Sequence, residues 1–148
     1  MARRKISGSS PTRLLFGFIA GFLATLIFHQ LTLAVLWKFG VAHVAPFSMA
    51  ATKPYRIPAL FSLAFWGGIW GVGFAMIDSS FPRRAGYWLM AFLFGAIFPS
   101  LLALLVVLPL KGRPIGGGWH LPVLLTTFLI NGAWGIGTGI FLKVLSRR

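Results

Sequence analysis

Three strongly polar side chains interrupt the apolar stretches of this chain: His29, Gln30 and Asn131. An imidazole can carry a proton or ligate a metal, and a carboxamide can hydrogen-bond a solute. Polar groups in lipid are costly unless they are paired, so these residues mark a candidate intramembrane polar site. His29 and Asn131 lie at similar depth and would meet if their two stretches are neighbours. The alternative is that all three only hydrogen-bond neighbouring helices.

The sequence offers little for other kinds of chemistry. His29 is the only histidine inside an apolar stretch, since His43 and His120 fall between stretches, and the chain has no cysteine. Haem usually requires two axial ligands at matching depth, and a metal site requires three or four ligands. A single acid, Asp78, leaves no carboxylate pair and no nucleophile–base set. We therefore expect no catalytic residues, no metal and no cofactor, and a protein that is not an enzyme.

These residues must be positioned by four apolar stretches that carry no charged side chain. Each is about 20 residues long, which as a helix crosses a hydrocarbon core of about 30 Å. The runs are continuous instead of alternating, which favours helices over a barrel. The sequence predicts an all-α membrane protein with one domain over residues 1–148. The predicted spans are residues 14–36, 59–77, 87–110 and 122–142.

The basic residues are unevenly distributed between the two sides that these spans define. Nine of the 14 precede the first span, lie between the second and third, or follow the fourth: Arg3, Arg4, Lys5, Arg13, Arg83, Arg84, Lys143, Arg147 and Arg148. The other five lie in the two remaining loops: Lys38, Lys53, Arg56, Lys111 and Arg113. The positive-inside rule then predicts that both termini are cytoplasmic. Basic residues at helix ends bind anionic head groups, so we expect a bilayer as partner and no nucleic acid.

The single acid closes the second span beside two serines. Asp78 lies close in sequence to Arg83 and Arg84. We expect it to form an interfacial ion pair there and not to act as a proton carrier.

An internal repeat relates the two halves of the chain. Residues 68–73, Gly-Ile-Trp-Gly-Val-Gly, match residues 132–137, Gly-Ala-Trp-Gly-Ile-Gly, at an offset of 64. The first and third spans align more weakly at an offset of 70, where Phe22-Leu23 matches Phe92-Leu93. The sequence predicts two duplicated helical hairpins, a parallel 2+2 repeat with units of residues 14–78 and 87–143.

Small residues and one proline shape the predicted helices. Glycines four apart lie on one helix face, where they permit close van der Waals approach in lipid. These predicted packing positions are Gly17, Gly21, Gly67, Gly71, Gly135 and Gly139. Pro99 interrupts the third span next to Ser100, and we expect a kink there.

Three segments of the first half together resemble a group of small four-helix inner-membrane proteins of bacteria. The segments are Ile27-Phe28-His29-Gln30-Leu31, Ala45-Pro46-Phe47 and Phe65-Trp66-Gly67-Gly68. The resemblance implies a compartment, the bacterial inner membrane, and no activity. Two functions remain open: an accessory or packing subunit in a homo-oligomer or larger membrane complex, and a minimal dimeric transporter or channel using His29, Gln30 and Asn131.

Overall fold

The computed structural model describes residues 10–147, and within them the fold is all-helical. Four helices are long and apolar enough to cross a membrane: Pro11–Lys38, Ala59–Ser80, Ala85–Leu110 and Leu121–Leu145. The predicted all-α fold with four apolar helices is therefore confirmed for these residues. All four helices extend one to three residues beyond a predicted end. The first begins early because Pro11 suits a first helical position and the Ser10 hydroxyl accepts the Arg13 N–H at 3.3 Å.

The two odd-numbered spans each contain one π turn. The first is α1 (Pro11–Ala24), a π turn (Thr25–His29) and α2 (Gln30–Lys38). The third is α4 (Ala85–Leu102), a π turn (Ala103–Val107) and α5 (Leu108–Leu110). The second is α3 (Ala59–Ile77) with a 3₁₀ turn (Asp78–Ser80), and the fourth is α6 (Leu121–Leu145).

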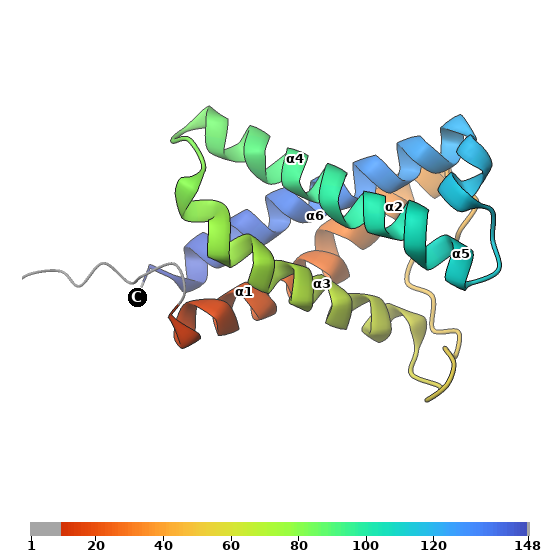
Figure 1. Ribbon diagram of the computed structural model, residues 1–148, viewed down its shortest axis with the longest axis horizontal. Coiled ribbons are helices and arrows are strands. Elements are labelled where there is room, and N and C mark those ends of the chain that lie inside the picture. Colours follow the sequence, from red (N-terminus) through yellow and green to blue (C-terminus); the bar gives the residue numbers. More distant parts are fainter. Residues whose placement is uncertain (1–9, 148) are drawn as a thin grey trace, which may run out of the picture.

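The four spans pack in the order α3, α1, α6, α4. The extensive backbone contacts are α1 with α3, α4 with α6, and α1 with α6, whereas α3 and α4 meet through aromatic side chains. We call α1 to α3 the first hairpin and α4 to α6 the second. Figure 1 shows the start of α1, the α3–α4 turn and the end of α6 at one end of the molecule, the terminal end. The two longer loops lie at the opposite, loop end.

The core lies among α1, α3, α4 and α6 and is mainly aromatic. Phe74 and Phe94 pack edge to face with ring centroids 5.4 Å apart, and Phe94 stacks on Trp134 at 6.4 Å. Ala20 and Ala24 belong to the same cluster and are fully buried. Aromatic pairs in these geometries add about 0.5–1.5 kcal/mol beyond area burial. Large rings from three helices thus meet small residues of α1.

The loop between α2 and α3 folds back on itself. The Thr52 N–H donates to the Ile57 carbonyl at 2.9 Å, and the Ala59 N–H donates to the Ala50 carbonyl at 2.8 Å. Tyr55 lies at the tip of this loop and is 83% exposed.

The loop between α5 and α6 is a left-handed turn, Ile115–Trp119. Gly116, Gly117 and Gly118 have φ of 63°, 62° and 71°, and Trp119 has φ of 59°. Residues with a Cβ rarely adopt a positive φ, so the run of three glycines permits this turn.

Candidate functional site

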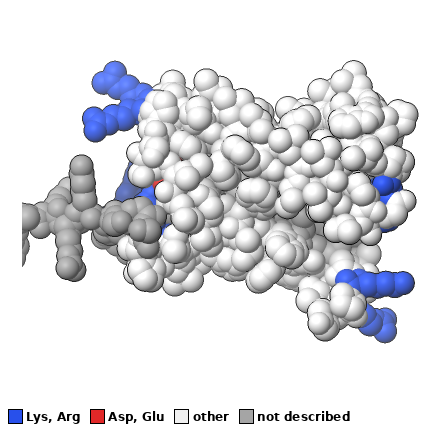
Figure 2. All heavy atoms as spheres, in the orientation of Figure 1, with Lys and Arg blue, Asp and Glu red and all other residues white. Residues whose placement is uncertain are grey.

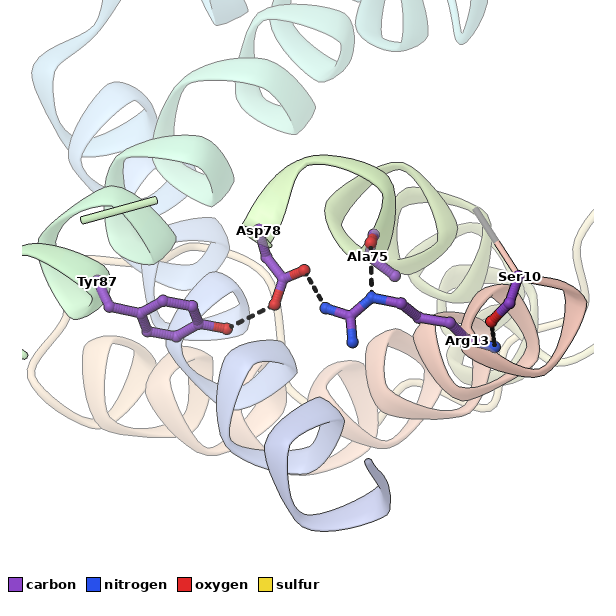
Figure 3. Close-up of polar contacts among 5 residues, drawn as sticks. All are labelled: Ser10, Arg13, Ala75, Asp78 and Tyr87. Atoms are coloured by element: carbon purple, nitrogen blue, oxygen red, sulfur yellow. Dashed lines mark hydrogen bonds and ion pairs between the residues drawn. The ribbon is translucent and has the colours of Figure 1, made fainter. Parts of the chain in front are cut away.

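Three helices are joined by a hydrogen-bonded network at the terminal end, drawn in Figure 3. The Arg13 guanidinium of α1 pairs with Oδ1 of Asp78, at the end of α3. The Tyr87 hydroxyl of α4 donates to Oδ2 of Asp78 at 3.1 Å. Arg13 Nε also donates to the Ala75 carbonyl at 3.2 Å. Both carboxylate oxygens of the single acid are therefore satisfied.

The predicted partners of Asp78 were wrong. Arg83 and Arg84 are exposed, and the ion pair is instead made by Arg13, which is distant in sequence. The reason is the packing of α1 along α3, which carries the first turn of α1 past the last turn of α3. The side chains of Asp78 and Arg13 are 6% and 17% exposed, so this pair is more buried than an interfacial pair.

The fourth helix contributes a cation to the same end. Lys143 Nζ of α6 lies 3.5 Å from the Tyr87 ring centroid and 4.6 Å from that of Trp88. A cation over a partly desolvated ring gains about 0.5–2 kcal/mol. The network and this contact tie all four spans together at the terminal end. Neither the Tyr87–Asp78 hydrogen bond nor the Lys143 contact with the aromatic rings was predicted from the sequence.

His29 and Gln30 lie together, at the junction of the π turn and α2. They are 6% and 3% exposed. Gln30 Nε2 lies 3.3 Å from Nδ1 of His29, and Gln30 Oε1 accepts the Phe47 N–H at 2.6 Å. Gln30 therefore attaches the α2–α3 loop to the first span.

Asn131 lies in a different cluster, between α4 and α6. Its amide donates to the Ser100 hydroxyl at 3.0 Å, and that hydroxyl donates to the Thr127 carbonyl at 3.2 Å. α1 and α6 are neighbours, yet within residues 10–147 no hydrogen bond links Asn131 to His29 or Gln30. The structure thus divides the three polar residues between two separate clusters.

Trp134 makes a buried contact that sequence reasoning missed. Its indole Nε1 donates to the Gly21 carbonyl at 3.0 Å, and the residue is 2% exposed. The Thr25 hydroxyl donates to the same carbonyl at 2.9 Å, and the π turn begins at Thr25. Competition for a backbone carbonyl loosens an α-helix, which accounts for the π turn at this point. The sequence feature that could have indicated this contact is the second Gly-x-Trp-Gly-x-Gly, which contains Trp134.

Glycines mediate the contact within each hairpin. A methyl group on Gly17 would lie 2.5 Å from the Gly71 carbonyl oxygen, and one on Gly21 would collide with the Gly67 carbonyl. In the second hairpin, Gly95 approaches the Asn131 carbonyl just as closely. Of the predicted packing positions, Gly139 is the least tight, since a methyl there would lie 3.1 Å from the Tyr87 ring.

The two hairpins make the same contacts in a register that differs from the predicted one. The equivalent contacts are Gly17 and Gly21 against Gly71, and Ala91 and Gly95 against Gly135. The first-helix members are 74 positions apart, and the second-helix members are 64 apart. The predicted offset of 70 between the first and third spans therefore differs from the observed 74 by four residues, which is about one helical turn. Matches among Phe and Leu did not define the register, because those side chains recur throughout both spans.

Among residues 10–147, the charged side chains lie at the ends of the four spans. Figure 2 shows Lys and Arg only at the ends of this face, with an uncharged body between them. Large apolar side chains on the body, such as Trp66 and Phe98, are 58% and 52% exposed. Within the described residues, no group of three or more His, Cys, Asp or Glu could hold a metal ion.

Comparison with protein families, with curated proteins and with solved structures finds no match to this chain. The function is therefore inferred from the sequence and from the geometry of the site.

Proposed function

We propose that this chain is an integral membrane protein whose role is structural: an accessory or packing subunit in a homo-oligomer or a larger complex of the bacterial inner membrane. The observation that carries this proposal is the pairing of its polar side chains. His29 and Gln30 are buried and bonded to each other and to a loop, and Asn131 is bonded to Ser100. Interhelical bonds of this kind average about 0.6 kcal/mol and hold helices together.

The distribution of charge supports insertion in a bilayer with both termini cytoplasmic. Four apolar helices present an uncharged, apolar body, and the basic residues lie at its two ends. Lys and Arg at helix ends are retained by anionic head groups. In the sequence, nine of the 14 basic residues precede the first span, lie between the second and third, or follow the fourth, and the positive-inside rule assigns that side to the cytoplasm.

We further propose that the two hairpins arose by duplication. The support is the equivalent contact of small residues in both, at constant offsets of 74 and 64. Duplication of a self-packing hairpin produces a compact bundle without requiring a transport path.

The competing function is a minimal dimeric transporter or channel. It would need His29, Gln30 and Asn131 along one water-accessible path. Their division between two bonded clusters favours the structural role.

Native mass spectrometry of the tagged protein, gently extracted from its own membrane, tests the proposal. A complex of defined mass with a stoichiometric foreign subunit supports the accessory role, whereas a clean homodimer with no partner would favour the transporter or channel. His29→Phe is the matched variant, and it should leave that assembly intact. A transport activity in proteoliposomes that His29→Phe abolishes would contradict the structural role and support the transporter.

A further inference from the structure

Large apolar side chains are exposed outside the four spans, and within residues 10–147 they occur at one end only. They lie in the α2–α3 loop, residues 39–58, and in the α5–α6 loop: Phe39, Val44, Phe47, Met49, Tyr55, Ile57, Ile115 and Trp119. In the α3–α4 turn at the terminal end, by contrast, Phe81 packs against Phe74 and Tyr87, with ring centroids 5.5 and 5.8 Å away. Lipid contact along the spans does not account for the exposed side chains of the loop end, because none of them belongs to a span.

The charged side chains of the same two loops are all basic. Lys53, Arg56, Lys111 and Arg113 are exposed, and neither loop contains Asp or Glu. Figure 2 shows Lys and Arg at this end of the molecule. Aromatic rings are enriched in the head-group region of a bilayer, and cations there meet anionic phosphates. The combination of exposed rings, cations and no acid therefore matches the surface of an anionic leaflet.

The backbone of the α2–α3 loop is extensively paired within the chain. Besides the bonds that fold the loop back on itself, the Arg56 N–H donates to the Thr52 carbonyl at 2.7 Å, and the Leu60 N–H donates to the Ser48 carbonyl at 2.9 Å. Three prolines in the loop have no N–H to satisfy. Unpaired backbone groups are costly in lipid, so this internal pairing lowers the cost of placing the loop where water is scarce.

Gln30 fixes the position of this loop relative to the spans. Its Oε1 accepts the Phe47 N–H, and Phe47 has a φ of 53°, a region that bulky side chains rarely adopt. Such a conformation persists only where surrounding contacts impose it. Figure 1 shows the loop crossing the loop end from α2 to α3, no farther along the long axis than the α5–α6 loop. The loop is therefore held at the level where the spans end.

We propose that the α2–α3 loop is immersed in the head-group region of the leaflet at the loop end. Its exposed apolar side chains contact lipid there, and Lys53 and Arg56 bind the phosphates of anionic phospholipids. Gln30 is the positioning residue that holds the loop at this depth. The inference rests on the proposed insertion in a bilayer, independently of the accessory role, and gives one of the buried polar residues a specific task.

A spin label at the tip of the loop measures its depth. The chain has no cysteine, so Tyr55→Cys provides a single labelling site. The labelled protein is placed in phosphatidylcholine–phosphatidylglycerol nanodiscs, where both faces of the bilayer are open to solution. Electron paramagnetic resonance then gives the collision rates of the label with oxygen, which partitions into lipid, and with a water-soluble nickel chelate. We expect the oxygen-to-nickel ratio to be several-fold higher than for a label at Ser80→Cys, an exposed position in the turn at the terminal end.

Three variants separate the contributions to this depth. Phe98→Cys places the label on an exposed side chain within a span, and it should give the highest ratio. In the Tyr55→Cys background, Gln30→Leu removes the acceptor of the Phe47 N–H, so the ratio should fall towards that of Ser80→Cys. Lys53→Gln with Arg56→Gln should also lower it, as should nanodiscs of phosphatidylcholine alone. These two cations are exposed, so that variant should unfold at the same temperature as the parent.

Frequent nickel collisions at Tyr55→Cys would place the loop in water and overturn the proposal. Exclusion of both reagents, with dipolar broadening between labels, would overturn it as well, because a second copy would then cover the loop. A ratio that Gln30→Leu leaves unchanged would overturn the positioning role, and one insensitive to the two cations and to phosphatidylglycerol would overturn phosphate binding. Failure of bilayer insertion is separate, since it would show as frequent nickel collisions at Phe98→Cys.

Discussion

The two hairpins contact each other at two interfaces, α1 with α6 and α3 with α4, and these interfaces differ. α1 and α6 are in close contact, with Trp134 bonded to a backbone carbonyl and Phe28 seated on Gly137. α3 and α4 touch through Phe74, Trp70 and Phe94, and at the terminal end through the Asp78–Tyr87 bond. The difference follows from side-chain size at equivalent positions of α1 and α4. In lipid, where the surroundings are as apolar as the protein, close approach of backbones and paired polar groups decide which helices associate.

The largest effect is expected where backbones touch within a hairpin. Gly21→Leu places a side chain against the Gly67 carbonyl, which cannot move without shifting α3. We expect the free energy of unfolding to fall by about 3 kcal/mol or more. This is at the upper end of the range of about 1–3 kcal/mol that is typical of overpacking. Thermal unfolding followed by circular dichroism in detergent measures it. Gly95→Leu is the equivalent change in the second hairpin, and a large effect of one variant with a mild effect of the other would refute the equivalence of the two contacts.

The next effect concerns the polar link between α3 and α4. Asp78→Ala leaves the Arg13 guanidinium, 17% exposed, without its carboxylate and removes the acceptor of the Tyr87 hydroxyl. Breaking a buried pair costs about 3 kcal/mol. The control is the double change Arg13→Met with Asp78→Leu, which should recover most of the loss. Unfolding in a mixed-micelle denaturant titration compares them, and equal losses in both would contradict the assignment of the loss to an uncompensated Arg13 charge.

Exchanging the side chains that distinguish the α1–α6 contact from the α3–α4 contact should give unequal effects on stability. Ala24→Phe in α1 should cost about 2 kcal/mol, because a ring must enter a fully buried site in the core. Phe98→Ala in α4 should change stability by less than about 0.5 kcal/mol, because Phe98 is 52% exposed. Thermal unfolding of the two variants measures both effects. Similar effects of the two changes would mean that side-chain size does not separate the contacts.

The smallest effect separates the two equivalent tryptophans. Trp134→Phe removes one buried hydrogen bond to the Gly21 carbonyl and should cost about 1 kcal/mol. Trp70→Phe removes no hydrogen bond made within residues 10–147 and should cost less. Unfolding midpoints at constant detergent concentration give the comparison. A larger loss for Trp70→Phe in the purified protein would contradict the expectation that the Trp134 hydrogen bond distinguishes the two tryptophans.

Local sequence was sufficient for some of these features. The approximate extent of the four helices follows from apolar length, although the first helix begins at Pro11, three residues before its predicted start. Asp78 could be recognised as an ion-pair residue because it is the only acid. Its partner could not be found, since Arg13 approaches it only through the packing of α1 on α3.

The register between the two hairpins also shows what local sequence could and could not predict. Offset 64 was readable because Gly-x-Trp-Gly-x-Gly is a distinctive pattern, whereas the other offset had to be measured from backbone contacts at Gly21 and Gly95. Leu, Ile and Phe are interchangeable in lipid, so their order along a span carries little information about register.

By itself the sequence determined the class of fold, because length and apolar content decide whether a helix can cross about 30 Å of hydrocarbon. Tertiary structure decided which polar groups meet: Gln30 with Phe47, Asn131 with Ser100, and Asp78 with Arg13. The physical reason is that a hydrogen bond requires two groups within about 3 Å. Those distances are set by the crossing of helices from distant parts of the chain, where glycine and alanine allow close approach and phenylalanine prevents it.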